Sequence, residues 1–119
     1  MHSSIVIIDY SKEIILYDHG ELMIDLKSIL IGEERVIGLQ IKLPFTIFIF
    51  IFNSKGFLCG NSINMNYLNN EACICKVSKC SNYEECLNSE VIECNESASN
   101  SGIKIGMSGK DALLKMYEG

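Results

Sequence analysis

The chain has 119 residues, 48% of them hydrophobic, and a net charge of −5 at pH 7. This length predicts one domain, and the hydrophobic fraction is sufficient for a single core. Nucleic-acid-binding proteins concentrate lysine and arginine in patches, whereas acidic residues are in excess here, so we expect no nucleic-acid partner.

The first 22 residues are predicted to be an extension of the main domain. Residues 5–8 and 14–17 are apolar runs that suit the two strands of an added hairpin. The alternative hypothesis is that the gene is read too early and that translation begins at Met23. The segment has neither the basic region nor the cleavage site of a secretory signal, which predicts a cytoplasmic protein.

Strands dominate the middle of the chain. Residues 22–31, 36–43 and 45–52 are predicted as three strands, with a turn at 32–35 and a stop at Pro44. A turn at 53–56 leads to a fourth strand at 57–61. Isoleucine and phenylalanine alternate from 47 to 52, which predicts a strand buried on both faces. The run is far shorter than the roughly 20 residues of a membrane helix, so we expect no membrane contact.

The second half mixes helices and strands. Short helices are predicted at 64–70 and 82–88, strands at 72–77 and 91–94, and a helical turn at 95–101 closed by Gly102. The last helix begins after Ser108, with Asp111 at the position of a capping-box partner. The sum is an α+β fold: a single compact domain with a mostly antiparallel sheet and short helices on one face.

Several short motifs mark residues 43–113. They are Leu43-Pro44 before the apolar strand, Lys55-Gly56-Phe57, Cys59-Gly60, Leu87-Asn88 and the stretch 106–113. In these motifs the chain resembles the YunC-like family, small archaeal and bacterial proteins of unknown function. The resemblance covers about residues 23–118, which makes 23–119 the YunC-like domain and leaves 1–22 outside it. It departs after Cys59-Gly60, where relatives usually carry a Leu-Asp-like pair, so an acid–base role for that aspartate has no counterpart here.

Five cysteines lie close together in the second half, at Cys73, Cys75, Cys80, Cys86 and Cys94. Their spacing lacks the paired C-x2–4-C knuckles of structural zinc sites and the C-x2-C-x2-C runs of iron–sulfur proteins. We therefore expect them to pack as small hydrophobes, with no metal and no cofactor. The resemblance agrees, because relatives carry Ala, Val or Leu at the first four positions. The alternative is a metal or cluster protein that uses all five, and disulfides are least expected without an export signal.

Cys59-Gly60 is the first candidate site, because this pair is part of the family pattern. Gly60 permits close approach of a ligand or a tight turn. Cys59 is the candidate catalytic residue of a thiol-dependent enzyme or sulfur carrier, which would need a base or a cation. Both histidines lie in the N-terminal extension, so Lys55 and Lys110 are the available cations. The competing interpretation, which we favour, is a buried cysteine at the end of a strand.

The second candidate site is the predicted start of the last helix. A helix N-terminus offers free N–H groups to an anion, which suggests a small anionic ligand here. The candidate ligand-binding residues are Gly106, Ser108, Gly109, Lys110 and Asp111. This is not a P-loop, because Lys104 and Asp111 stand where that motif needs Gly and Ser or Thr. Asp111 would also repel an anion, and the competing interpretation is a capped helix start packed on the sheet.

Three classes of function follow. We favour a small cytoplasmic module that binds a ligand or assembles with itself, as a homo-oligomer that covers apolar sheet surface. The second is a thiol enzyme centred on Cys59, with Ser108, Lys110 and Asp111 sharing its pocket. The third is the metal or cluster protein. A composition rich in Ile, Lys, Asn and Glu, with one Pro and no Trp, is typical of an AT-rich genome and suggests an archaeal source.

Overall fold

The computed structural model describes residues 5–9, 13–18, 22–60, 63–64 and 71–118. It contains one sheet of eight strands, in which every strand lies beside its neighbour in sequence. All neighbours pair antiparallel except β6 and β7, which are parallel. The strands are β1 (Ile5–Asp9), β2 (Glu13–Asp18), β3 (Leu22–Ile31), β4 (Glu34–Leu43), β5 (Thr46–Phe52), β6 (Gly56–Cys59), β7 (Cys73–Val77) and β8 (Val91–Cys94).

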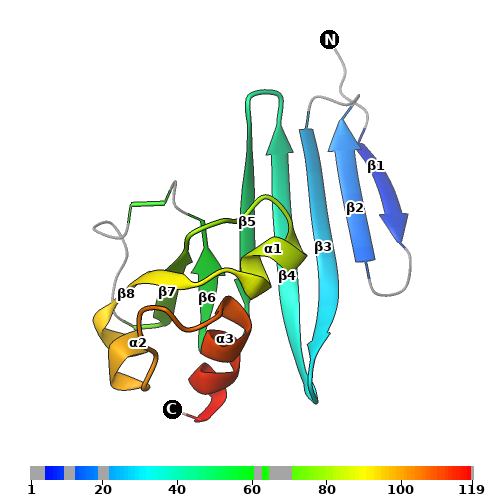
Figure 1. Cartoon of the computed structure of the whole chain (residues 1–119). Coiled ribbons are helices and arrows are strands. Elements are labelled where there is room, and N and C mark those ends of the chain that lie inside the picture. Colours follow the sequence, from blue (N-terminus) through cyan, green and yellow to red (C-terminus); the bar gives the residue numbers. More distant parts are fainter. Residues whose placement is uncertain (1–4, 10–12, 19–21, 61–62, 65–70, 119) are drawn as a thin grey trace.

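Three short helices belong to the C-terminal third: α1 (Tyr83–Asn88), α2 (Glu96–Asn100) and α3 (Gly109–Glu118). They lie on one side of the sheet, with α2 and α3 over β6–β8 and α1 reaching over β4, where Tyr83 packs on Gly38 (Figure 1). The predicted α+β class, with a mostly antiparallel sheet and helices on one face, is therefore confirmed. The predicted helix at 64–70 falls almost entirely outside the described residues.

The N-terminal extension forms β1, which is one edge of the sheet, and β2 beside it, at the end of the sheet farthest from the helices (Figure 1). Here β1 pairs with β2, and β2 pairs with β3, both antiparallel. The place where translation begins stays a prediction.

Each helix begins at a polar side chain that accepts a hydrogen bond from a backbone N–H of the first turn. Asn82 Oδ1 accepts from Glu85 N at 2.8 Å, and Asn95 Oδ1 accepts from Ala98 N at 3.0 Å. Ser108 Oγ accepts from Asp111 N at 3.1 Å, which confirms the predicted cap of the last helix. Such caps stabilise short helices because they satisfy N–H groups that have no partner within the helix.

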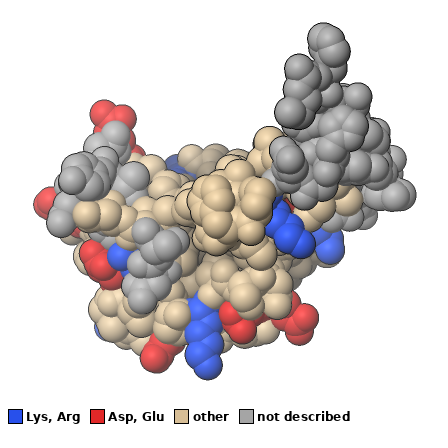
Figure 2. All heavy atoms as spheres, turned by 90° about the horizontal axis from the view of Figure 1, so that it is seen from above, with Lys and Arg blue, Asp and Glu red and all other residues tan. Residues whose placement is uncertain are grey.

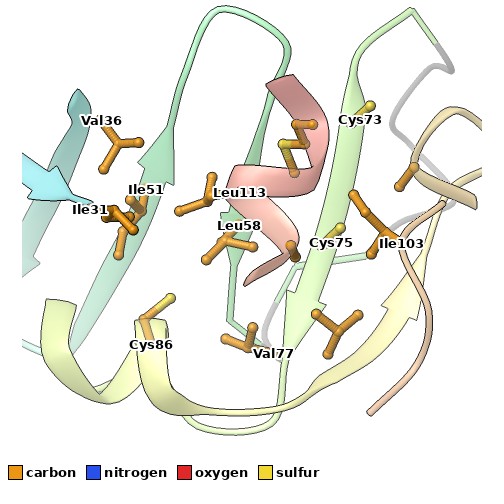
Figure 3. Packing of buried hydrophobic residues seen from close by; sticks show 14 of the residues in the cluster. Ile31, Val36, Ile51, Leu58, Cys73, Cys75, Val77, Cys86, Ile103 and Leu113 are labelled. Carbon is orange, nitrogen blue, oxygen red and sulfur yellow. The ribbon is translucent and has the colours of Figure 1, made fainter. Parts of the chain in front are cut away.

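The core lies between the helices and the sheet. Ile51, Leu58 and Val77 from three neighbouring strands face Leu113 and Met116 of α3, and all five side chains are completely buried (Figure 3). Cys73, Cys75 and Cys86 belong to the same cluster, as the core interpretation of these cysteines predicts.

The prediction that β5 is buried on both faces is wrong in part. Ile49 and Ile51 are buried, but Ile47 on the same face is 41% exposed. The phenylalanines at 48, 50 and 52, on the opposite face, are only half-buried. The reason is that the helices cover one face of the sheet and reach only one end of β5 (Figure 1).

The charged side chains of the described residues are scattered on the view along the strands, and neither sign forms a broad patch there (Figure 2). Among the described residues, the structure has no helix long and apolar enough to span a membrane.

Candidate functional site

Cys59 is the last residue of β6 and points away from the helices. Its neighbour Leu58 lies in the core beneath α3, and successive side chains of a strand point to opposite faces. In register, Cys59 lies opposite Phe50 of β5 and Lys76 of β7. The side chain has no exposed surface.

The environment of Cys59 keeps its thiol protonated. Burial raises the pKa of Cys59 to about 12, and the positive charge of Lys76 offsets only part of that rise. The thiolate is the nucleophilic form of cysteine, so a thiol with this pKa is inert at neutral pH. The geometry therefore favours the buried strand-end cysteine over a resting nucleophile.

Lys76 is a buried cation on the same face, and the sequence did not single it out. It is 8% exposed, and its Nζ lies 3.3 Å from Oε1 of Glu93 on β8. A buried charge is tolerated when it is paired, so Glu93 explains why Lys76 can sit inside the sheet. The available signal was the lysine itself, which interrupts the apolar strand 73–77.

Gly60 is packed against a cysteine rather than left open to a ligand. A Cβ atom at this position would lie 3.2 Å from Cβ of Cys80. The absent side chain thus makes room for Cys80 beside the end of β6.

Most backbone N–H groups of the turn at residues 106–111 already donate hydrogen bonds to other groups of the protein. Gly106 N donates to Val91 O and Gly109 N donates to Ser89 O, both at 2.8 Å. Ser108 accepts from two further N–H groups of the first turn, at Asp111 through Oγ and at Ala112 through its carbonyl oxygen. These contacts favour a capped helix start docked on the sheet, because few N–H groups are left to face an anion.

Two glycines fit this turn for different reasons. Gly106 has a φ of 95°, which is a conformation that favours glycine. A Cβ at Gly109 would lie 2.5 Å from the carbonyl oxygen of Cys86, so this glycine permits close contact between α3 and α1. Both glycines therefore have structural roles.

Cys59 and the turn at 106–111 do not share a pocket. Gly109 packs on Leu58 and Val77, on the helix side of the sheet, whereas Cys59 points to the other side. Lys110 instead lines a hollow of about 360 Å³ beside β3, together with Lys27 and Tyr83. Glu84 lines it as well, so the hollow carries charges of both signs.

The five cysteines of the second half are divided among separate contacts. Cys73 Sγ lies 3.3 Å from Ser101 Oγ, Cys75 lies opposite Cys94 in the register of β7 and β8, and Cys80 Sγ lies 3.9 Å from the carbonyl oxygen of Ile49. In the described part of the chain, no three Cys, His, Asp or Glu side chains are grouped as metal ligands.

Comparison with known proteins places the chain among relatives without an assigned activity. Residues 59–116 match the model of a family described as a domain of unknown function (DUF1805). Over 101 residues the chain is 27% identical to "Uncharacterized protein YunC" of Bacillus subtilis (strain 168), covering 81% of this chain and all of the relative. The resemblance to the YunC-like family is confirmed.

The fold of the chain also matches a solved structure. That structure is a protein of unknown function, TA1206, from Thermoplasma acidophilum, with a TM-score of 0.73 and 24% identity over 80% of this chain and 94% of the other. The family-model match at 59–116 includes Cys59, Lys76, Glu93 and the turn at 106–111. The strands β1–β5 lie outside that match.

Proposed function

We propose that this YunC-like domain is a self-assembling module whose copies associate through the face of the sheet opposite the helices. We call this surface the open face. Among the described residues, its apolar side chains include Ile24, Leu26, Ile37, Leu39, Ile41, Phe48, Phe50, Phe52 and Phe57.

The strand register supports this assignment of residues to one face. Leu26, Leu39 and Phe50 lie directly opposite one another on β3, β4 and β5. Ile24, Ile41 and Phe48 form the next row on the same three strands. Residues opposite each other in register point to the same side, so these rows build a continuous apolar surface.

The alternation of side chains along β3 and β4 is the observation that carries the proposal. Lys27 on β3, and Gln40 and Lys42 on β4, point to the helix side and lie outside the core cluster. The residues between them, on the open face, are all apolar. A strand with one polar and one apolar face buries the apolar one, so this pattern predicts that another surface covers the open face.

The open face also has a hollow suited to projecting apolar side chains. It has a volume of about 430 Å³, and its lining includes Leu39, Phe50, Phe52 and Phe57. The rings of Phe50 and Phe57 are 5.9 Å apart in an edge-to-face arrangement. Large aromatic side chains of this kind dominate the energetics of protein interfaces.

Charge favours a second copy of the chain as the occupant. Each chain carries a net charge of −5, which opposes self-association in general. On the open face, however, the buried charge of Lys76 is paired with Glu93. Two such faces can therefore meet around a two-fold axis with this ion pair intact, and two sheets packed face to face interdigitate their side chains.

The proposal is tested by placing a charge on either side of β5. Phe48→Asp puts a carboxylate on the open face, and Ile47→Asp puts the same group on the adjacent residue, which is 41% exposed on the opposite face. Burying an unpaired carboxylate costs several kcal/mol, so Phe48→Asp should weaken association by at least about 100-fold. Sedimentation velocity would measure the mass of each protein against the 13.3 kDa of one chain.

We expect multiples of 13.3 kDa for the unmodified chain and for Ile47→Asp, and a monomer for Phe48→Asp. Equal masses for the two variants, or a monomeric unmodified chain at micromolar concentration, would refute assembly through the open face. A monomer that binds a small apolar probe in the hollow would instead support a ligand-binding module. The cytoplasmic location and archaeal source stay predictions from composition and the N-terminus.

A further inference from the structure

A hollow on the helix side of the sheet lies where β3, α1 and the start of α3 meet. It has a volume of about 360 Å³, which is within the size range of pockets that bind small molecules. It lies across the sheet from the open face, because Lys27 of β3 is in register with Gly38 and Ile51, and Ile51 belongs to the helix-side core. A ligand bound here therefore leaves the proposed assembly surface uncovered.

The floor of the hollow is apolar and is held in place by the fold. Gly38 has no side chain, and the space above it is filled from two sides: a Cβ atom at Gly38 would lie 2.7 Å from Cε1 of Tyr83 and 2.9 Å from Cδ1 of Ile29. The Tyr83 hydroxyl donates to the carbonyl oxygen of Asp25 at 3.2 Å, and Leu87 continues the same face of α1 one turn later. This floor is formed before a ligand arrives, which lowers the entropic cost of binding.

Charges of both signs surround this floor. Lys27 lies on β3, Lys110 in the first turn of α3 and Glu84 in the first turn of α1, and all three side chains are exposed. In the described part of the chain, no ion pair joins either lysine to Glu84. The amide of Asn88 adds a neutral donor and acceptor at the end of α1. The rim therefore offers two cations and one anion that a ligand can bridge.

We infer that this hollow binds a free α-amino acid with an apolar side chain. The carboxylate of the ligand lies between Lys27 and Lys110, its ammonium group faces Glu84, and its side chain covers the apolar floor. A ligand that is only an anion would be repelled by Glu84, whereas a zwitterion matches both signs of charge. Of the residues at 106–111 that the sequence suggested for an anionic ligand, Lys110 alone lines the hollow.

The test is titration calorimetry of the unmodified chain with leucine and with two analogues that each lack one charge. Isocaproate lacks the ammonium group and isoamylamine lacks the carboxylate, whereas all three compounds share one branched hydrocarbon. Leucine should bind with a Kd of about 1 mM or below. Each analogue should bind at least about tenfold more weakly, because a hydrogen bond between charged groups is lost.

Two variants locate the site, and a third is the matched control. Lys110→Gln should weaken leucine binding about tenfold. Lys104→Gln removes the same charge from an exposed position outside the hollow and should leave leucine binding unchanged. Glu84→Gln should weaken leucine binding to the level of isocaproate without weakening isocaproate binding, a change in selectivity that a merely structural role of Glu84 would not produce.

Three results would overturn the proposal. They are an analogue that binds as tightly as leucine, an equal loss of leucine binding in Lys110→Gln and Lys104→Gln, and no binding of leucine, valine or phenylalanine at about 10 mM. Because the hollow and the open face lie on opposite sides of the sheet, these measurements do not depend on whether copies of the chain associate.

Discussion

Asn95 joins three segments of the C-terminal half, which makes its removal an informative perturbation. Its Oδ1 accepts from Ala98 N in the first turn of α2 and from Ile74 N of β7, both at 3.0 Å. Its Nδ2 donates to Ala72 O at 2.8 Å. The side chain thus caps α2 and ties the edge strand β8 to the start of β7.

The expected loss for Asn95→Ala follows from these three bonds. A helix cap contributes about 1 kcal/mol, and each of the other two hydrogen bonds contributes about 1 kcal/mol, which gives about 3 kcal/mol in total. For a chain of this length, 1 kcal/mol corresponds to roughly 4 °C in Tm, so we expect a decrease of about 12 °C. Asn82→Ala is the matched control, because Asn82 caps the exposed start of α1 through one bond to Glu85 N and should lose only about 4 °C.

Thermal unfolding followed by circular dichroism would measure both values. All proteins should be compared at one concentration, since self-association makes Tm depend on concentration. If Asn95→Ala lowers Tm no more than Asn82→Ala does, the hydrogen bonds from Asn95 to β7 do not contribute to stability. The account of how β7 and β8 are held together would then be wrong.

Two further predictions concern ionisable groups. Burial raises the pKa of Cys59 to about 12, so Cys59 should react with iodoacetamide on the order of a thousandfold more slowly in the folded chain than in the unfolded chain. Rapid labelling of Cys59 in the folded state would restore the thiol-enzyme hypothesis. Glu85 has its pKa lowered from 4.5 by hydrogen bonds from the Ser81 hydroxyl and backbone N–H, so its contribution to stability is present above pH 4.5 and is lost as the pH falls through the folded-state pKa. The Tm of Ser81→Ala should therefore lie slightly below that of the unmodified chain at pH 7 and approach it at low pH, whereas a difference that grows on acidification would contradict this assignment.

Local patterns in the sequence were sufficient to predict most elements. The alternation at 47–52 and the turn at 53–56 define β5, and the cap at Ser108 defines the start of the last helix. These signals act between residues that are close in the chain, so one sequence contains them. The parallel pairing of β6 with β7 depends on a connection between distant segments, which local patterns do not specify.

The candidate site was harder to predict because it depends on which face each side chain occupies. The thiol-enzyme hypothesis placed Ser108, Lys110 and Asp111 in one pocket with Cys59, but the sheet lies between Cys59 and these residues. The single residue step from Leu58 to Cys59 determines this, since Leu58 faces the helices and its neighbour faces away. The pairing of Lys76 with Glu93 required the register of β7 and β8, which no local pattern supplied.

The most direct test of the central claim is the native mass of the unmodified chain in solution, measured by sedimentation velocity over a range of micromolar concentrations. Assembly through the open face predicts a species of two or more times 13.3 kDa that Phe48→Asp dissociates and Ile47→Asp does not. A single species of 13.3 kDa at every concentration would contradict it.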